Sequence, residues 1–413
     1  MVVPDAMVAG GAALARDDGG RVVFVEGALP GERVRVRVGR ARPDYAQASV
    51  VEVLERSPER VEPPCPARRA GCGGCGWLHV RPGAQRRYRA DIVIDALRRI
   101  ARIDDPPVPS LREVTEPALR TTARLGVSAS GRAGHNRPAP TSGRRRPPGP
   151  APVRATTVVP TESCLAAHPL LEELVVHGRY PGSDEVVLRA GVASGERLVW
   201  ARRSSRPAAV QVPAGVAVVE PGGTRQAVVH EEVAGRRFRI GAESFFQPGP
   251  VAAAALVAAV GGAAGDALAG GGHLVDLYAG VGLFASVLGA RCSARVTAVE
   301  RHSPAVADAR ANLADLDARV VETEVARWRL DAGDGPPDLV VADPARPGLG
   351  RPGVSAVGAS ATPRLVLVSC DPASLARDTR LLAEAGYRLA TVELVDAFPH
   401  TPHVETVSRF DRQ

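Results

Sequence analysis

The sequence contains no lysine, so all 52 of its basic residues are arginines. Aromatic residues are also scarce, at 4% of the 413 residues, whereas glycine and proline are abundant. Such a composition is typical of the codon usage of a GC-rich genome. The net charge of +7 therefore does not by itself identify a nucleic-acid partner.

Long apolar runs are absent as well. No stretch reaches the roughly 20 charge-free residues of a membrane span, and the N-terminal MVVPDAMVAGG lacks the basic-then-apolar layout of a signal peptide. We therefore expect a cytoplasmic protein with no membrane partner. At ~150 residues per domain the length suggests two or three domains. With 45% hydrophobic residues, the chain is not wholly disordered.

Cysteines are few, and six of them in so long a chain do not make a disulfide scaffold. Cys65, Cys72 and Cys75 form a C-x6-C-x2-C cluster, Cys164 stands alone, and Cys370 follows an apolar run. In a cytosolic protein such a cluster indicates metal or iron–sulfur ligation before disulfides.

The pattern of apolar residues and turn residues divides the chain into three parts. Val-rich runs with Gly/Pro turns in residues 1–56 predict a small β barrel, a shape often used to hold nucleic acid. Residues 57–240 predict a central α+β domain, within which the Pro- and Arg-rich residues 131–155 predict a mobile loop. In residues 241–413 apolar strands alternate with helices, which predicts a doubly wound α/β domain.

A glycine turn lies in the third part, in the segment VDLYAGVGLFA. Gly280 and Gly282 allow the backbone to turn tightly beside a ligand. Glu300 ends the next strand, 24 residues after Asp276, where a carboxylate can hold the two ribose hydroxyls of an adenosine ligand. The same segment satisfies the dinucleotide fingerprint G-x-G-x-x-A, so an NAD-dependent oxidoreductase is an alternative at this point.

Two later strands end in reactive side chains. Asp343 closes the run DLVVAD and Cys370 closes RLVLVSC. Ligands of open α/β sheets bind at the carboxyl ends of the strands, so both side chains are expected near the glycine turn. Near the C-terminus, VDAFPHTPHVETV carries Glu405. A carboxylate paired with a cysteine nucleophile fits this segment better than an H-x2-H-x-E zinc site, because the segment lacks a helical histidine pair.

Six motifs in order resemble those of the SAM-dependent uracil-C5 RNA methyltransferases, over nearly the whole chain. They are FVEGALPGERVRVRV, which is similar to the RNA-binding TRAM barrel, then SFFQP, VDLYAGVGLFA, VADPARPGL, VSCDPASLARD and VDAFPHTPHVE. The resemblance implies a class I SAM-dependent methyltransferase domain preceded by a TRAM-like, OB-type barrel. It also implies methylation of uracil C5 in structured RNA, which yields 5-methyluridine.

The resemblance further implies a role for individual residues. Cys370 is the expected nucleophile, which adds to C6 of uracil, and Glu405 is the expected general base. The residues expected to bind S-adenosyl-L-methionine (SAM) or the target base are Gln247, Tyr278, Gly280, Glu300 and Asp343.

The cysteines resemble a particular branch of the family. Cys65, Cys72, Cys75 and Cys164 are similar to the four thiolate ligands of a [4Fe–4S] cluster in the branch that modifies 23S ribosomal RNA. That branch makes 23S rRNA the favoured substrate, with tRNA as the alternative. Zinc in a four-cysteine site is the alternative metal. We expect the enzyme to act as a monomer.

The chain departs from the family pattern at several positions. Asp371 follows Cys370 where the family has Asn, and its carboxylate is expected to raise the pKa of Cys370. Leu283 replaces a polar Asn, which would remove one cofactor contact, and Glu324 is the candidate acceptor for the adenine amine. Because of Asp371, a non-catalytic RNA-binding protein on a degenerate methyltransferase fold is kept as a second functional class.

Overall fold

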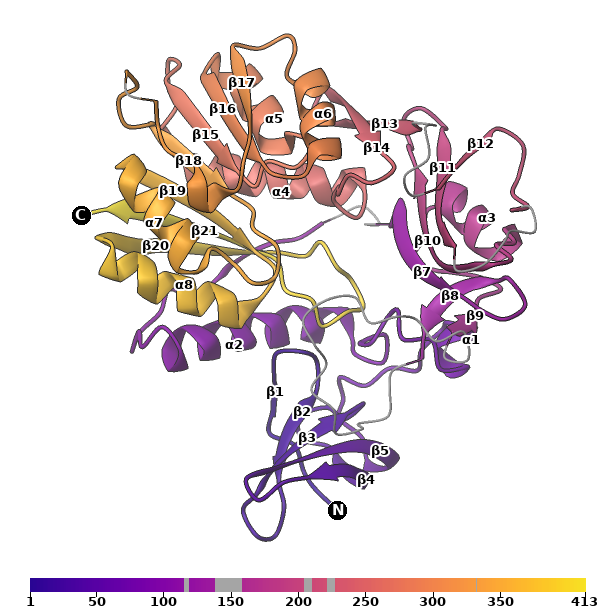
Figure 1. The fold of residues 1–413 in the computed structure, drawn as a ribbon. Helices are drawn as coiled ribbons and strands as arrows, with labels where there is room; N and C mark the ends of the chain where they lie inside the picture. The colour runs from indigo at the N-terminus through magenta and orange to yellow at the C-terminus, as the bar shows by residue number, and fades with distance from the viewer. Residues whose placement is uncertain (115–118, 138–157, 204–209, 221–226, 332) are drawn as a thin grey trace.

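The computed structural model describes residues 1–114, 119–137, 158–203, 210–220, 227–331 and 333–413. Over these residues the strands form sheets of five, six and eight strands and one two-stranded hairpin. In Figure 1 the long helix α2 (Pro82–Arg99) runs between the five-stranded sheet and the eight-stranded sheet. No helix within the described ranges is both long and apolar enough to cross a membrane.

The N-terminal sheet closes into a small barrel. Its order is β1-β2-β3-β5-β4, with bounds β1 (Ala6–Met7), β2 (Ala13–Arg16), β3 (Val22–Glu26), β4 (Arg33–Ala41) and β5 (Tyr45–Glu55). Val2, just before β1, pairs with Val34 of β4, so the two edges of the sheet meet. Alternate residues such as Val23 and Val25 are buried inside, as the period of a strand requires. The predicted barrel is confirmed.

The six-stranded sheet makes up the central part. Its strands, in order across the sheet, are β12 (Val216–Val219), β11 (Arg197–Arg203), β10 (Ser183–Ala190), β7 (Thr122–Val127), β8 (Ala133–Asn136) and β9 (Val158–Pro160). Helix α3 (Pro169–His177) buries Leu171 and Leu174 against it, and the short α1 (Pro66–Arg69) lies near β8 and β9. Residues 133–136, which were expected to be loop, form β8 because they pair on both sides. Residues 138–155 of that expected loop lie outside the described residues.

The eight-stranded sheet has the doubly wound arrangement that the sequence predicts. Its order is β17 (Ala318–Glu322), β16 (Arg295–Glu300), β15 (His273–Leu277), β18 (Leu339–Ala342), β19 (Arg364–Ser369), β21 (Thr406–Arg412), β20 (Tyr387–Val395) and β6 (Ser110–Arg112). Only β21 runs antiparallel to its neighbours. From β15 the chain continues to one side and later returns to β18 on the other. That reversal leaves a crevice at the carboxyl ends of these strands.

Helices cover both faces of this sheet (Figure 1). One apolar cluster contains α4 (Pro250–Ala264) and α5 (Leu283–Cys292), and another contains α2, α7 (Gly350–Ser360) and α8 (Pro372–Glu384). Helix α6 (Ser303–Asn312) follows β16, and a 3-10 turn, η2 (Val325–Arg327), follows β17.

The segment 57–240, expected to be one central domain, contributes to more than one packing unit. Val93 and Leu97 of α2 belong to the apolar cluster of α8, and β6 pairs with β20. The hairpin of β13 (Val228–Val233) and β14 (Arg236–Gly241) packs against α4. The eight-stranded sheet is therefore completed by residues that precede position 241 in the chain.

Candidate active site

The turn between β15 and α5 has a left-handed backbone at three positions. The φ angles are 62° at Tyr278, 56° at Gly280 and 86° at Gly282. Glycine adopts this conformation freely, whereas for tyrosine it is strained, and such strain concentrates at functional sites. Gly282 is the N-cap of α5, so the turn presents the end of the helix that favours polar or anionic ligands.

Asp276, in β15, binds the first turn of the helix that follows the glycine turn. Its side chain is fully buried, and Oδ2 accepts a hydrogen bond from the Ala285 N–H at 2.9 Å. Oδ1 is buried without a hydrogen-bond partner among the residues that the structure describes. The pKa of Asp276 is raised to about 8, mainly by burial; the hydrogen bond from Ala285 N–H opposes the rise and the charges of Asp343 and Glu300 contribute to it. The carboxyl group is therefore protonated at neutral pH.

Glu300, at the end of β16, faces the same turn. Its Oε2 accepts a hydrogen bond from Gly280 N–H at 3.0 Å, and Oε1 accepts from the N–H groups of Arg301 and His302 at 2.7 and 2.8 Å. An ionised carboxylate offers about four acceptor positions. The three backbone bonds therefore orient Glu300 and leave it able to accept a hydroxyl of a ligand.

Asp343 and Gln247 meet across the crevice. Gln247, which is buried in the SFFQP segment, donates from Nε2 to Asp343 Oδ2 at 3.2 Å. Burial raises the pKa of Asp343 to about 7, and the Gln247 hydrogen bond opposes this rise. Because the Asp343 N–H also donates to Leu277 O at 3.3 Å, the carboxyl group lies next to the glycine turn.

Cys370 and Glu405 come together at the neighbouring strand ends. Ser369 of β19 pairs with Thr406 of β21, so the residue after one strand and the residue before the other lie side by side. The pKa of the Cys370 thiol is raised to about 12, mainly by burial and then by the charges of Glu405 and Asp343. Burial and the Asp343 charge raise the pKa of Glu405 well above its usual value. The site thus places a thiol beside two carboxyl groups whose pKa values are both raised.

Asp371 does not act on Cys370 as the sequence suggested. Its side chain is the N-cap of α8, and Oδ1 accepts a hydrogen bond from Ser374 N–H at 2.8 Å. The carboxylates that raise the pKa of Cys370 are Glu405 and Asp343 instead. The expected effect of Asp371 on the thiol was therefore wrong.

Two neighbours of the site were missed in the sequence. Phe245 is 70% exposed although the adjacent Phe246 and Gln247 are buried. An exposed aromatic ring next to a site is a surface on which a nucleobase can stack. The positive charge of Arg346 lowers the pKa of Cys370 against the causes that raise it. The two adjacent phenylalanines of SFFQP were the available signal for Phe245, because successive side chains of an extended segment point to opposite sides and both rings are then rarely buried.

Leu283 and Glu324, the other two positions singled out in the sequence, make contacts that are common in folded proteins. Leu283 begins α5 and is buried in the apolar cluster of α4 and α5. Glu324, the candidate for the adenine amine, precedes η2 and lies 3.7 Å from the guanidinium of Arg301.

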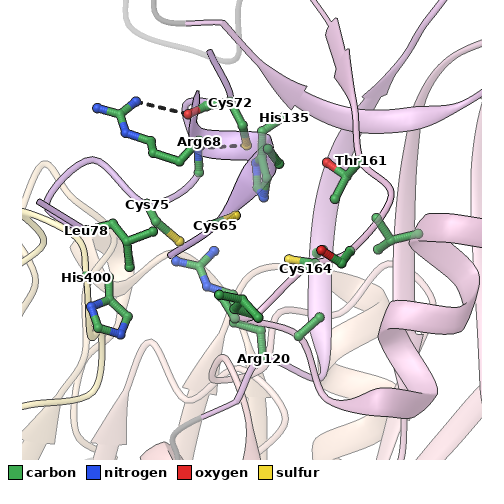
Figure 2. Close-up of a pocket in the computed structure, with 18 of the residues that line it drawn as sticks. Cys65, Arg68, Cys72, Cys75, Leu78, Arg120, His135, Thr161, Cys164 and His400 are labelled. Carbon is green, nitrogen blue, oxygen red and sulfur yellow. Dashed lines mark hydrogen bonds between the residues drawn. The ribbon is translucent and has the colours of Figure 1, made fainter. Parts of the chain in front are cut away.

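The four candidate ligands Cys65, Cys72, Cys75 and Cys164 line one cavity of about 260 Å³ (Figure 2). Burial raises the pKa of Cys75 to about 11, the nearby Arg120 guanidinium opposes the rise, and the other three thiols add to it. In the described ranges, no three His, Cys, Asp or Glu side chains converge as the ligands of a metal ion would. The structure thus brings the thiols around one cavity without drawing them to a single point.

A doubly wound sheet with a glycine turn, a carboxylate at the next strand end and reactive groups at adjacent strand ends is the arrangement that the sequence predicts for a methyltransferase domain. Comparisons with known proteins identify the family. Residues 9–51 match the TRAM domain. An uncharacterized RNA methyltransferase of Streptomyces avermitilis is 36% identical over 97% of this chain and 95% of its own length. One of Thermotoga maritima is 30% identical over 97% and 96%, respectively.

The chain therefore belongs to this family of RNA methyltransferases, which confirms the predicted enzyme class. Among solved structures, the Pyrococcus abyssi tRNA (uracil-54, C5)-methyltransferase in complex with S-adenosyl-L-homocysteine has a TM-score of 0.71 with this chain. The match covers 99% of both chains at 21% identity, and it confirms the predicted fold.

Proposed function

We propose that the protein methylates C5 of uracil in RNA with SAM as the methyl donor. The observation that carries the proposal is the pair of Cys370 and Glu405 at adjacent strand ends, beside the crevice of the glycine turn. A thiol and a buried carboxyl group are the nucleophile and base that this reaction needs, and an oxidoreductase would use neither.

The reaction begins with the thiolate of Cys370. Its sulfur forms a bond to C6 of uracil, and the electrons of the C5–C6 double bond move into an enolate that makes C5 nucleophilic. Bound SAM would supply the electrophilic methyl group: C5 would form the new C–C bond as the S–CH3 bond breaks and its electron pair stays on sulfur, which leaves S-adenosyl-L-homocysteine. The charge of Arg346 favours the thiolate over the thiol.

Glu405 completes the reaction by removing the proton from C5. The electrons of the broken C–H bond re-form the C5–C6 double bond, and Cys370 leaves C6 as a thiolate. The raised pKa of Glu405 makes its carboxylate a stronger base than an exposed glutamate, which suits the abstraction of a carbon-bound proton.

The remaining residues at the crevice would bind the substrates. Glu300 is oriented to accept the ribose hydroxyls of SAM, and Gly280 and Tyr278 shape the turn around the adenosine. Asp343 and Gln247 are placed to hold the methionine part of SAM or the target base. The target base must leave its stack to reach Cys370, so a loop or bulge is a better substrate than a duplex.

The proposal includes a [4Fe–4S] cluster in the four-cysteine cavity. A cluster takes one thiolate at each of its four irons, and the proposal is supported by the position of all four thiols in the lining of one cavity. A zinc ion would instead need the sulfurs to converge within about 2.3 Å of one point. Anaerobically purified protein should contain about four irons and four sulfides per chain. Cys65→Ser should lose the iron and Cys292→Ser should keep it, whereas stoichiometric zinc would contradict the proposal.

The favoured substrate is 23S rRNA, acted on by a cytoplasmic monomer whose TRAM barrel contacts the RNA. The structurally similar Pyrococcus abyssi enzyme acts on tRNA, so tRNA is the second candidate. The test transfers labelled methyl groups from SAM to 23S rRNA fragments and to tRNA transcripts and maps 5-methyluridine. Wild type should label C5 of one uridine and Cys370→Ala should not. Label in Cys370→Ala, or binding of NADH without binding of SAM, would refute the proposal.

A further inference from the structure

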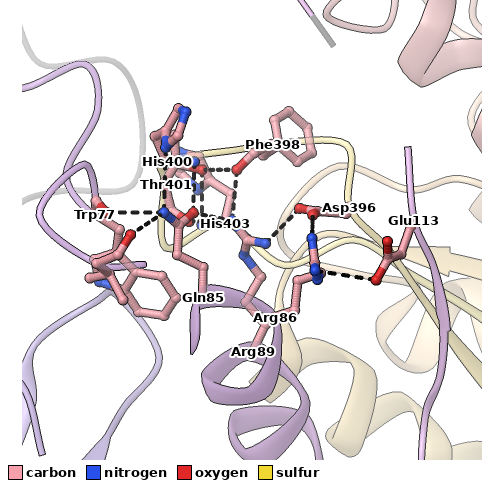
Figure 3. A network of polar contacts seen from close by, with 11 residues as sticks. Trp77, Gln85, Arg86, Arg89, Glu113, Asp396, Phe398, His400, Thr401 and His403 are labelled. Carbon is pink, nitrogen blue, oxygen red and sulfur yellow. Dashed lines mark hydrogen bonds and ion pairs between the residues drawn. The ribbon is translucent and has the colours of Figure 1, made fainter. Parts of the chain in front are cut away.

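A buried arginine of α2 holds the segment that leads into Glu405. Arg89 donates from Nη1 to Asp396 Oδ1 at 2.7 Å, and from Nη2 to the carbonyl oxygens of Phe398 and Thr401 at 2.8 and 2.9 Å (Figure 3). Only 2% of its side chain is exposed. Three of its hydrogen bonds thus bind one stretch of six residues.

A second side chain of α2 holds the strained point of the same segment. His400 has a φ of 63°, a conformation that non-glycine residues keep only where their surroundings impose it. Its N–H donates to Gln85 Oε1 at 2.8 Å, and its carbonyl oxygen accepts from the Trp77 N–H at 2.8 Å. Gln85 in turn donates from Nε2 to Trp77 O and Val80 O at 3.2 and 2.7 Å.

Hydrogen bonds within the segment connect the residues that Arg89 and Gln85 bind to the backbone of Glu405. Thr401 Oγ1 donates to Phe398 O at 3.0 Å and accepts from the His403 N–H at 3.3 Å, so the turn is closed on itself. At its other end, the carbonyl oxygen of Glu405 accepts from the Val395 N–H at 2.9 Å. A displacement of Thr401 would therefore move the backbone that carries Glu405.

A contribution to the stability of the fold does not by itself explain why a charged arginine is buried at position 89. Arg89 has one carboxylate partner, and its Nε is buried with no hydrogen-bond partner in the described part of the chain. A buried ion pair is often no more stabilising than an apolar pair of similar volume, but it can impose a single conformation. The reaction itself uses neither Arg89 nor Gln85.

We infer that Arg89 and Gln85 are positioning residues that fix the backbone of segment 396–401 and thereby aim Glu405 at the C5 proton. The inference rests on the proposed function, in which Glu405 is the base. It separates two parts of the site: Cys370 and the SAM crevice lie on strands that this network does not hold, so addition and methyl transfer should survive its loss.

Single-turnover reactions with labelled SAM and RNA test the inference, read on a denaturing gel that separates RNA joined to Cys370 from released methylated RNA. Arg89→Met keeps the length of the side chain and removes its donors. We expect unchanged SAM affinity, retained methyl transfer and release slowed at least tenfold, so that the adduct accumulates. Arg89→Lys should restore part of the release rate.

Arg86→Met is the matched control. Arg86 lies on the same helix and pairs with the side chains of Glu113 at 3.2 Å and Asp396 at 3.7 Å, and among the described residues it has no hydrogen bond to a backbone carbonyl of the segment. It should release product as wild type does. Gln85→Glu is the second variant, which keeps the acceptor for His400 N–H but loses both donors, and it should also accumulate adduct.

The outcomes are distinguishable. Wild-type ratios of adduct to released product in Arg89→Met and Gln85→Glu would overturn the inference. So would a joint loss of SAM binding and methyl transfer in both variants, because that pattern indicates a damaged fold. Absence of methylated RNA with the wild-type enzyme, or of adduct with Glu405→Gln, would instead refute the proposed function.

Discussion

Replacing Glu405 by glutamine probes the electrostatics of the site and its chemistry together. The two side chains have the same shape and Glu405 is only 5% exposed, so the substitution removes a charge without opening a cavity. Burial is the main cause that raises the pKa of Cys370 to about 12, and the Glu405 charge is the next. Glu405→Gln should therefore lower the pKa of Cys370.

The magnitude follows from the pKa of the thiol. With a pKa of about 12, raised from 9.0, roughly one Cys370 in 10⁴ is ionised at pH 8, against about one in ten without the shift. Each unit by which the substitution lowers this pKa should accelerate the alkylation of Cys370 by iodoacetamide about tenfold.

The assay follows the alkylated Cys370 peptide by mass spectrometry between pH 7 and pH 11. Identical profiles for wild type and Glu405→Gln would refute the electrostatic reasoning. With RNA and SAM, the same variant should accumulate methylated RNA joined to Cys370, because an amide cannot take the C5 proton. If it released methylated RNA at the wild-type rate, Glu405 would not be the base, and Asp343 would be the next carboxylate to test.

Glu300→Ala should weaken SAM binding by about 1.5–3 kcal/mol, because the ribose hydroxyls lose a charged acceptor. Calorimetry would show this, and unchanged SAM affinity would contradict it. Asp371→Ala removes the N-cap of α8 and should cost about 0.5–2 kcal/mol of unfolding free energy. The alkylation profile of Cys370 should not change. The pKa of Asp276 is about 8 in the folded state, above its usual 3.8, so the folded state binds more protons and loses stability as pH rises between these values. Asp276→Asn should flatten that decline in urea unfolding at pH 6 and pH 9, and an unchanged slope would contradict the assignment.

The sequence was enough to predict that Asp343 and Cys370 lie at the same edge of the sheet. Asp343 and Cys370 each end an apolar run, and the carboxyl ends of neighbouring parallel strands must meet. The role of Asp371 was not predicted correctly, since adjacency in the chain was taken as adjacency in space. The following proline was the overlooked signal, because Asp-Pro is a typical N-cap and first helical residue.

The partners of α2 could not be read from its apolar pattern. Ile92 packs with the N-terminal barrel, while its neighbour Val93 packs with the core of the eight-stranded sheet. An amphipathic pattern shows that a face is buried but does not say against what. The same limit applies to the cysteines: the donor set is visible in the sequence, whereas their distribution around a cavity depends on the fold, which brings β8 and the segment of Cys164 to the loop of Cys72 and Cys75.

The contacts that hold the segment before Glu405 could not be predicted from the sequence, because Arg89 binds mainly backbone atoms of that segment. The carbonyl oxygens of Phe398 and Thr401 accept from Arg89 across 309 and 312 positions of the chain, and any residue type would supply them. Trp77 connects the same segment to the barrel, since its indole Nε1 donates to Gly11 O at 3.1 Å. Cys75, which lines the cysteine cavity, lies two residues before Trp77. The barrel, the cysteine cavity and the segment that leads to Glu405 thus meet at the loop around Trp77, and the residues of the VDAFPHTPHVE motif alone do not indicate this.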